Sequence, residues 1–280
     1  MNVGIFNFIT EYSMPITDLA REVEDRGFDS LWVPEHTHIP TSRLSPYPEG
    51  TELPEEYKHT LDPFVTLSAA AAVTSKIKLG TSIILIIERD TITTAKAGAT
   101  LDFQSNGRLM FGMGGGWNRE EAENHGTEWD TRFKRLEEQM QAIKKIWTED
   151  EAEFHGDHVD FDPIWAWPKP ISDPHPPLFL GGETIHTLRR VVKYGDGWLP
   201  RAGWPEQVLE GVGKLRQLAE EAGRDPSSID ISIFALLPDD DYWPSRFIDE
   251  GVNRIIFWLP PQDADAMRRM MDKVQPYLDA

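Results

Sequence analysis

The chain contains no cysteine among its 280 residues. Disulfide bonds, thiol nucleophiles and thiolate metal sites are therefore excluded. No apolar stretch approaches the roughly 20 residues that a membrane-spanning helix needs. The first strand-like run begins at Val3, which leaves no room for a signal peptide. We therefore expect a soluble, cytoplasmic protein with no membrane partner.

Basic residues are also scarce. The 28 lysines and arginines face 47 aspartates and glutamates, so the net charge is −19. A surface of this sign repels nucleic acid and anionic membranes. Nucleic-acid binding is accordingly not expected, and a small-molecule substrate is. Trp147 and Phe247 are apolar residues on helices that look exposed, and they suggest a homodimer interface, with ordinary packing on the side of the barrel as the alternative.

Eight short apolar runs alternate with eight helical stretches along the chain. Near-continuous apolar runs are typical of parallel strands covered on both faces. The expected strands are Val3–Phe8, Ser30–Pro34, Ile77–Ile84, Leu109–Gly112, Leu178–Gly181, Gly197–Pro200, Ile231–Ala235 and Arg254–Leu259. The expected helices are Pro15–Arg26 with Gly27 as its C-cap, Pro63–Ser75, Thr93–Gln104, Arg132–Trp147, Thr184–Tyr194, Pro205–Ala222, Ser245–Gly251 and Asp263–Val274.

Strand followed by helix, repeated to the C-terminus, predicts an α/β fold of the closed (β/α)8 TIM-barrel type, as a single domain over residues 1–280. An open doubly wound sheet is the alternative, because periodicity does not reveal strand order. Three longer connections break the regularity: Glu35–Leu61, Gly114–Thr131 and Thr148–Pro177. Their prolines predict ordered, irregular loops without hidden elements. The first two follow strands and should shape the barrel mouth, while the third follows a helix and suggests an inserted lobe.

Glu35, His36 and His38 directly follow the second expected strand, in the run WVPEHTHIP. In a TIM barrel this is the end at which catalysis occurs. A histidine beside a carboxylate suits general acid–base work near neutral pH, so His36 and Glu35 are the candidate catalytic residues. The pair His36 and His38 also has the spacing of a metal site, but the last residues of the later strands supply no suitable ligands, and no metal is expected. His38 then lines the substrate pocket or is an ordinary polar loop residue.

Two glycine-rich segments follow other strands: FGMGGGWNR at 111–119 and LFLGGET at 178–184. Glycines let backbone amides approach a ligand, and a helix N-terminus favours an anion such as phosphate. Gly181, Gly182 and Thr184 are thus a candidate phosphate cradle, with simple tight turns as the alternative. In the first segment, Trp117 suggests an apolar substrate wall. Glu120 and Glu121 are interpreted as helix-start acids rather than catalysts.

Five motifs in register carry a family resemblance. They are WVPEH, LGTSI, RLMFGMGGGWNREE, PHPPLFLGG and YGDGWLP, each at the end of an expected strand. Together they resemble the luciferase-like monooxygenase superfamily, and within it the probable F420-dependent oxidoreductases. The resemblance runs from the first strand to the last.

The resemblance implies a flavin or deazaflavin at the barrel mouth, with hydride moving to or from its ring. It places His36 near the ring, with Glu35 as the acid that precedes it, and a non-prolyl cis peptide at Ser82–Ile83. It assigns Gly181, Gly182 and Thr184 to the phosphate region and Gly114, Gly115 and Gly116 to the loop after the fourth strand. In the sugar-phosphate dehydrogenase branch a glutamate of that loop joins the chemistry. Gly115 stands in its place here, so oxidation of a sugar phosphate by that mechanism is not expected.

The resemblance favours coenzyme F420 over FMN. F420 carries an acidic polyglutamate tail, which needs basic residues near the mouth; the candidates are Arg43, Lys58, Arg89, Arg119 and Arg201. The alternative is that these residues are solvated loop charges. The expected reaction is hydride transfer between F420 and a small organic substrate, with His36 moving the proton. Two alternatives remain: an FMN-dependent monooxygenase that works with a partner reductase, and a flavin-binding protein without turnover.

Overall fold

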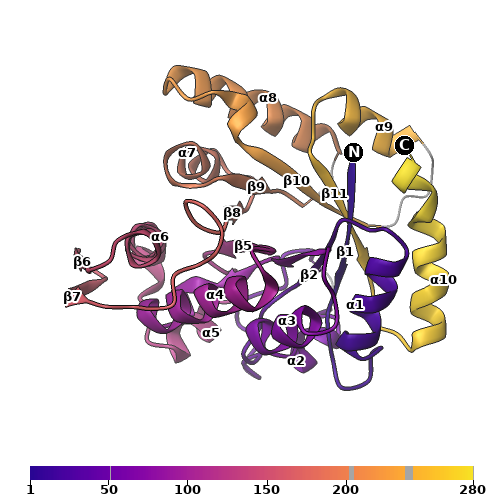
Figure 1. Ribbon diagram of the computed structural model, residues 1–280, viewed down its shortest axis with the longest axis horizontal. Helices are drawn as coiled ribbons and strands as arrows, with labels where there is room; N and C mark the ends of the chain where they lie inside the picture. The colour runs from indigo at the N-terminus through magenta and orange to yellow at the C-terminus, as the bar shows by residue number, and fades with distance from the viewer. Residues whose placement is uncertain (51, 202–204, 237–241, 280) are drawn as a thin grey trace.

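The computed structural model describes residues 1–50, 52–201, 205–236 and 242–279 (Figure 1). Parallel strands form a central barrel, and helices cover its outside. The barrel strands are β1 (Asn2–Asn7), β2 (Ser30–Val33), β3 (Lys78–Thr81) with its short continuation β4 (Ile84–Leu85), β5 (Leu109–Gly114), β8 (Leu178–Gly181), β9 (Gly197–Leu199), β10 (Asp230–Ala235) and β11 (Arg254–Leu259). The helices that alternate with them are α1 (Ile16–Asp25), α3 (Pro63–Ala71), α4 (Thr91–Ser105), α6 (Arg132–Thr148), α7 (Ile185–Tyr194), α8 (Pro205–Glu221), α9 (Tyr242–Asp249) and α10 (Ala264–Val274).

The strand pairing closes the barrel. The strands follow the order β3, β2, β1, β11, β10, β9, β8, β5, and β3 pairs in turn with β5, where Leu79 lies opposite Leu109. An open doubly wound sheet has two free edges, so that alternative was wrong, and the predicted TIM barrel is confirmed.

The core lies in two layers because strand residues alternate between the two faces of the barrel wall. One cluster fills the barrel interior and consists mainly of large side chains, including Phe6, Trp32 and Phe179. The other lies between the strands and the helices. Helix α1 shows how a helix joins this layer: it buries Leu19, Ala20 and Val23, and the chain leaves it through Gly27 at φ +85°.

The third predicted strand is interrupted. The peptide bond between Ser82 and Ile83 is cis, at the position expected for it, and it divides the predicted strand Ile77–Ile84 into β3 and β4. Ser82 keeps its place in the barrel wall, because its N–H donates to the carbonyl of Val33 at 2.8 Å. Ile83 extends over the ends of the neighbouring strands, where a Cβ on Gly114 would lie 2.1 Å from its Cδ1.

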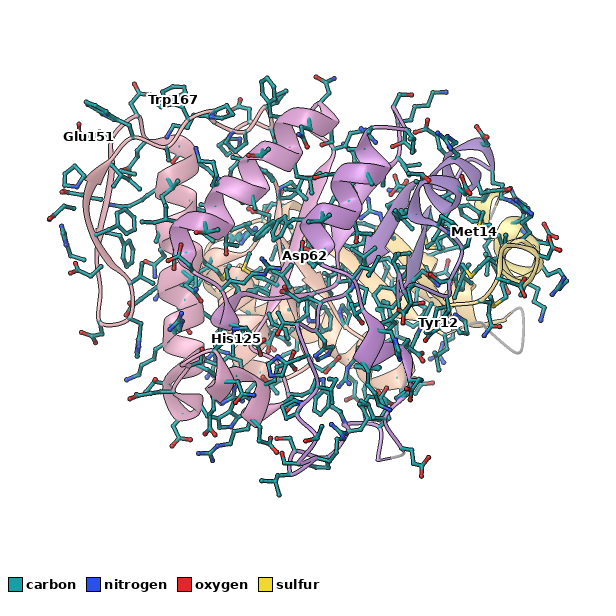
Figure 2. The ribbon with its side chains drawn as sticks, turned by 90° about the horizontal axis from the view of Figure 1, so that it is seen from below. Tyr12, Met14, Asp62, His125, Glu151 and Trp167 are labelled. Atoms are coloured by element: carbon teal, nitrogen blue, oxygen red, sulfur yellow. The ribbon has the colours of Figure 1, made fainter. Side chains whose placement is uncertain are left out.

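The three long connections contain regular elements, so the prediction of loops without hidden elements was wrong. The first contains α2 (Glu56–His59) and the second α5 (Arg119–Asn124), whose N-cap Asn118 accepts a hydrogen bond from the N–H of Glu121. The third contains an antiparallel hairpin of β6 (Ala152–His155) and β7 (Asp160–Ile164). This hairpin lies at the periphery beside α6, as expected of an inserted lobe (Figure 1). In Figure 2, Glu151 and Trp167 lie at the opposite side of the molecule from Met14.

The two aromatic residues expected at a dimer interface are buried. Trp147 is 2% exposed and Phe247 is 0% exposed, so that expectation was wrong. Trp147 lies between helices, where its Nε1 donates to the carbonyl of Ala95 at 2.8 Å and its ring packs against Phe111. Both residues therefore belong to the layer between the helices and the barrel. No helix in the described part of the chain is at once long and apolar enough to cross a membrane.

Candidate active site at the carboxyl ends of the strands

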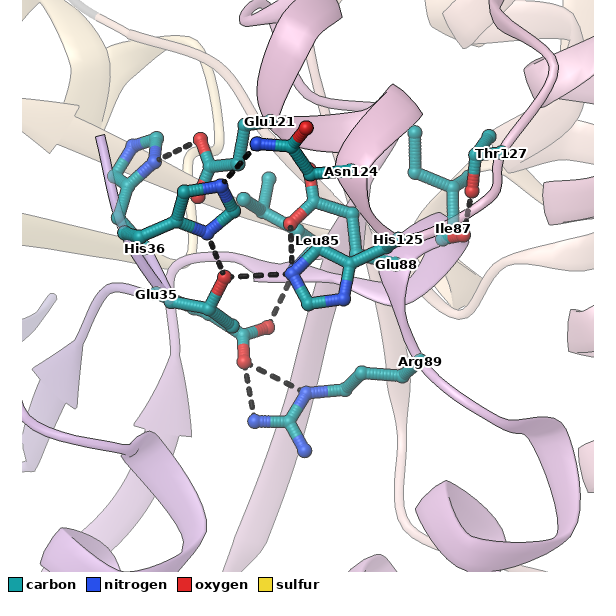
Figure 3. Close-up of polar contacts among 12 residues, drawn as sticks. Glu35, His36, Leu85, Ile87, Glu88, Arg89, Glu121, Asn124, His125 and Thr127 are labelled. Atoms are coloured by element: carbon teal, nitrogen blue, oxygen red, sulfur yellow. Dashed lines mark hydrogen bonds and ion pairs between the residues drawn. The ribbon is translucent and has the colours of Figure 1, made fainter. Parts of the chain in front are cut away.

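The candidate residues gather at one end of the barrel because parallel strands all end on the same side. Glu35 and His36 follow β2, the segment after β4 supplies Glu88 and Arg89, and α5 follows β5 and supplies Glu121 (Figure 3). These side chains form a cluster of acids and bases in which the carboxylates are almost fully buried. Figure 3 shows the polar contacts that these residues make.

Glu35 anchors the chain after the cis peptide. Its Oε2 accepts a hydrogen bond from the N–H of Leu85 at 2.8 Å, and its Oε1 accepts from Nε of Arg89 at 2.7 Å and from the Nη2 of the same guanidinium. Arg89 also pairs with Asp62 at 2.7 Å. The side chain of Glu35 is 2% exposed, and a buried carboxylate needs such donors. Glu35 therefore holds β4 against the end of β2, and its catalytic role stays a prediction.

The acid that contacts His36 is Glu121. Nδ1 of His36 lies 2.8 Å from Oε2 of Glu121, and the side chain of Glu121 has no exposed surface. A carboxylate on one imidazole nitrogen fixes the tautomer and leaves the other nitrogen for the substrate. Glu121 does lie in the first turn of α5, as the sequence predicts, but its burial was missed. The sequence signal for Glu121 is its position three residues after the N-cap Asn118, which marks the start of the helix but does not distinguish the buried Glu121 from Glu120.

A third carboxyl group, Glu88, was also missed. It ends η1 (Ile86–Glu88), the single turn that follows β4, and its side chain is 1% exposed. Burial, together with the charges of Glu121 and Glu35, raises the pKa of Glu88 to about 9. Nε2 of His125 is 3.8 Å from its Oε2. Nothing in the local sequence distinguishes this acid from an exposed loop residue.

His38 lies on the outer side of this cluster. Its Nδ1 contacts the hydroxyl of Thr37 at 2.9 Å, and its Nε2 contacts Nδ2 of Asn124 at 2.9 Å. Thr37 also contacts Nε2 of His125 at 2.7 Å. Strand β2 ends at Val33, so His36 and His38 do not share the strand face that the metal alternative requires. In the described ranges, no three or more potential ligands are placed to hold a metal ion.

Aromatic side chains form a wall beside His36. The ring of Tyr57 lies 5.1 Å from the imidazole and that of Trp117 lies 5.8 Å from it, centroid to centroid. Tyr47 packs against both, and its hydroxyl is 3.3 Å from that of Tyr57. Burial, with the hydrogen bond to Tyr47, raises the pKa of Tyr57 well above its ordinary value, so it stays a neutral phenol. The predicted position of Trp117 in a substrate wall fits this arrangement, and its role stays a prediction.

The glycines after β5 are required by close packing. A Cβ on Gly115 would lie 2.6 Å from Cε1 of Phe133, and Gly116 has φ +61°. No glutamate fits at position 115 without displacement of Phe133, which agrees with the departure from the sugar-phosphate branch. Gly114, the last residue of β5, is required in the same way by Ile83, whose Cδ1 would lie 2.1 Å from a Cβ there.

Gly181, Gly182 and Thr184 connect β8 to α7. Gly182 has φ +113°, and Thr184 is the N-cap of α7, where its Oγ1 accepts from the N–H of Thr187 at 3.2 Å. The first N–H groups of the 10-residue helix α7 have no partner within the helix, as is general for helix starts. The segment thus has the geometry of an anion cradle, and the predicted phosphate role has not been tested.

The basic residues named from the sequence do not form a free basic patch. Lys58 pairs with Glu55, Arg89 with Glu35 and Asp62, Arg119 with Glu123, and Arg201 with Glu183 and Glu49. Arg43 stacks over Trp117 with 5.8 Å between its Cζ and the ring centroid, and it has no ion pair among the described residues. Arg201 follows β9, and its contact with Glu183 places it beside the Gly182 turn. A polyglutamate tail would therefore compete with these carboxylates for the guanidinium groups.

A cavity of about 500 Å³ opens at the opposite end of the barrel. Its lining includes Lys78, Leu109, Asp230 and Arg254, which are the first residues of their strands or lie next to them. Arg254 is bound there by Asp29 at 2.6 Å and by Ser232 at 2.7 Å. This cavity lies away from His36, and conserved chemistry in such barrels belongs to the other end.

Comparison with known proteins supplies the family. A model of the luciferase-like monooxygenase family matches residues 4–238. This chain belongs to that family. An uncharacterized protein of Mycobacterium tuberculosis (strain ATCC 25618 / H37Rv) is 38% identical over 273 residues, which covers 95% of this chain and 94% of that one. An FMNH(2)-dependent dimethylsulfone monooxygenase of Pseudomonas putida is 31% identical over 63% of this chain and 49% of its own length.

Solved structures share the barrel. An F420-dependent secondary alcohol dehydrogenase in complex with an F420-acetone adduct gives a TM-score of 0.77 at 19% identity and covers 98% of this chain and 97% of its own. The coenzyme F420-dependent tetrahydromethanopterin reductase of Methanopyrus kandleri gives 0.74 at 18% identity and covers 99% of each chain. Riboflavin lyase RcaE with modified FMN gives 0.70 at 17% identity, over 89% of this chain and 66% of its own. F420-dependent and flavin-containing proteins therefore share the barrel fold of this chain.

Proposed function

We propose that this protein is an F420-dependent oxidoreductase that transfers a hydride between the deazaflavin and a small organic substrate at the carboxyl ends of the barrel strands. The observation that carries the proposal is the buried pair of His36 and Glu121 beneath an aromatic wall at this end. Hydride transfer to a carbonyl or an activated double bond creates a basic atom that needs a proton, and such a pair is suited to supply one.

The choice of F420 is supported by the lengths of the matching chains. This chain matches the two F420-dependent structures over at least 97% of their length, whereas it covers 66% of the FMN-containing lyase. The residues present also fit a phosphate group. The turn at Gly182 with the start of α7 offers N–H groups to an anion.

The roles of the residues follow from their contacts. The deazaflavin supplies or accepts the hydride when it is bound. Glu121 keeps the proton on Nδ1 of His36, so that Nε2 exchanges a proton with the substrate oxygen. Tyr57 and Trp117 exclude water from one side of the imidazole. Glu35 holds β4, and with it Ile83, in place at the carboxyl end of the barrel, where the ring would bind.

The second candidate is an FMN-dependent monooxygenase with a partner reductase. It is favoured by the dimethylsulfone monooxygenase, which is more similar in sequence than either F420-dependent structure, although the match covers 49% of it. The pairing of Arg89, Arg119 and Arg201 with carboxylates also favours a cofactor without an acidic tail.

Equilibrium binding of the purified protein to F420 and to FMN, each oxidised and reduced, tests the proposal through tryptophan fluorescence. Binding of F420 alone, followed by substrate-dependent oxidation of reduced F420 that His36→Gln slows, is the expected result. Preference for FMN and productive reaction of reduced FMN with oxygen would establish the monooxygenase instead. Tight cofactor binding without redox change over a panel of aldehydes, ketones and enones would identify a binding protein.

A further inference from the structure

Glu88 leaves two buried carboxyl oxygens without partners. Its side chain is 1% exposed, and neither Oε1 nor Oε2 has a hydrogen-bond partner within the described part of the chain. Buried polar atoms are nearly always hydrogen-bonded, because an unpaired one loses its hydration without compensation. The two oxygens of Glu88 therefore require a physical explanation.

Glu121 also has a buried carboxyl oxygen without a hydrogen-bond partner among the described residues. Its Oε2 contacts His36, while its Oε1 is buried and also has no partner among the described residues. The repulsion between the charges of Glu88 and Glu121 is among the main influences on Glu88. Two carboxyl groups that repel each other in a site of low polarity are more stable when one of them keeps its proton.

The other charged groups that face Glu88 do not neutralise it. Arg89 is already bound by Glu35 and Asp62, and Glu35 adds a further negative charge on the same side. Nε2 of His125 is 3.8 Å from Oε2 of Glu88, beyond a hydrogen bond, and it contacts Thr37 instead. An ionised Glu88 would thus be a buried charge without a hydrogen-bonded cation, whereas a protonated Glu88 has a donor for Oε1 of Glu121.

We propose that Glu88 is a positioning residue of this site: it remains a neutral carboxylic acid, donates its O–H to Oε1 of Glu121, and so keeps Glu121 ionised against Nδ1 of His36. This inference rests on the proposed function, because it gives Glu88 a part in preparing His36. One hydrogen bond then satisfies an oxygen on each carboxyl group, and no covalent bond to a substrate or cofactor is involved.

The consequence for His36 concerns its tautomer. An ionised Glu121 accepts a hydrogen bond from the N–H at Nδ1 and so keeps the proton on that nitrogen. Nε2 is then free to take a proton from the substrate or, once protonated, to give it one. Without the donor from Glu88, Glu121 itself would attract the proton and would then donate to Nδ1, so that neutral His36 would carry its proton on Nε2. The burial of Glu88, which raises its pKa to about 9, agrees with a neutral acid at pH 7.

Infrared difference spectroscopy tests the protonation of Glu88 without any turnover. The spectrum of the wild-type protein minus that of Glu88→Gln should contain the carbonyl band of a neutral carboxylic acid at pH 7, and this band should disappear as the pH is raised beyond about 9. Glu123→Gln, on the exposed side of α5, is the control and should remove no such band. A difference spectrum that shows an ionised carboxylate at pH 7 would overturn the proposal, whatever the fate of the proposed reaction.

Nitrogen NMR of His36 tests the positioning. Glu88→Gln keeps an N–H donor at position 88, so neutral His36 should keep its proton on Nδ1. Glu88→Met has a side chain of similar length without a donor, so the proton of His36 should shift toward Nε2. The rate of hydride transfer at pH 7 should stay within about twofold in the Gln variant and fall at least about tenfold in the Met variant, with cofactor affinity unchanged in both. Equal tautomers in both folded variants would overturn the proposal.

Discussion

Nδ1 of His36 lies 2.8 Å from Oε2 of Glu121, a carboxylate that is completely buried on a helix 85 residues further along the chain. The contact joins the end of β2 to the first turn of α5, so it exists only because the barrel brings the ends of β2 and β5 to the same side. It supplies His36 with the acidic partner that the adjacent Glu35, occupied by Arg89, does not provide.

We predict that His36→Gln lowers the rate of hydride transfer by about 10²- to 10⁴-fold, because the substrate loses its proton donor or acceptor. Glu121→Gln should lower the rate by about 10- to 100-fold, because the amide keeps a hydrogen bond but not the charge. Cofactor affinity, measured by fluorescence titration, should change by less than about threefold in both. His155→Gln, on the exposed hairpin, is the control for the histidine. Full turnover by either active-site variant would contradict the assigned roles.

We predict that Glu88 makes the folded protein less stable as the pH rises. Its pKa is raised from the ordinary 4.5 to about 9 in the folded state, so between these values the folded state keeps a proton that the unfolded state has lost. The stability associated with the protonated group is complete below about pH 4.5 and is lost progressively up to about pH 9. Glu88→Gln removes this dependence and should be increasingly more stable than the wild-type protein over that range.

The measurement is urea unfolding of both proteins between pH 5 and pH 8.5. The stability difference should grow by up to about 1.4 kcal/mol per pH unit. Glu123→Gln should show a flat difference, since Glu123 is on the surface and pairs only with Arg119 among the described residues. A flat difference for Glu88→Gln as well would show that Glu88 titrates normally.

The barrel was predictable because its signals are local and repeated. The bounds of β8 and β11 follow from their apolar runs alone, and α1 follows from its spacing and from Gly27. The site was predictable only in part. His36 could be named because it follows a strand directly, and the cis peptide because it belongs to a family resemblance.

The missed residues are acids whose importance comes from burial. Glu120 and Glu121 are neighbours in the sequence and both begin α5, yet Glu120 contacts the loop residue Ser45 while Glu121 is turned into the core against His36. Which of the two is buried depends on how α5 packs over the barrel, and that is a tertiary property. The same holds for Glu88, which becomes buried only when distant segments pack on the turn after β4, where Gln139 of α6 donates to the carbonyl of Ile86 at 3.0 Å.

We predict that the hydroxyl of Thr184 contributes to recognition of the cofactor phosphate. Thr184→Ala removes the N-cap of α7, which should destabilise the protein by about 1 kcal/mol and weaken the ordering of the turn at Gly182. Affinity for the phosphorylated cofactor should fall about 3- to 10-fold, while affinity for the same ring system without phosphate stays unchanged. Asp263→Ala, which removes the N-cap of α10, is the matched control for stability. Equal loss for both ligands would place the phosphate elsewhere.

Gly115 should tolerate no side chain. A Cβ at this position would lie 2.6 Å from Cε1 of Phe133, and the ring of Phe133 is itself held between the guanidinium groups of Arg132 and Arg190, at 4.2 Å and 4.5 Å from its centroid. Gly115→Ala should therefore lower the free energy of unfolding by about 1 to 3 kcal/mol.

Two further variants separate this clash from a general effect of alanine. Gly213→Ala, in the interior of α8 with no atom within 4 Å of the new Cβ, should instead stabilise the protein by up to about 1 kcal/mol. Phe133→Leu should restore part of the stability that Gly115→Ala removes, because a smaller side chain vacates the space that the Cβ needs. If Gly115→Ala were as stable as the wild-type protein, the loop after β5 would have room for a larger residue. The absence of a glutamate there would then reflect the chemistry of the substrate rather than the packing of Phe133.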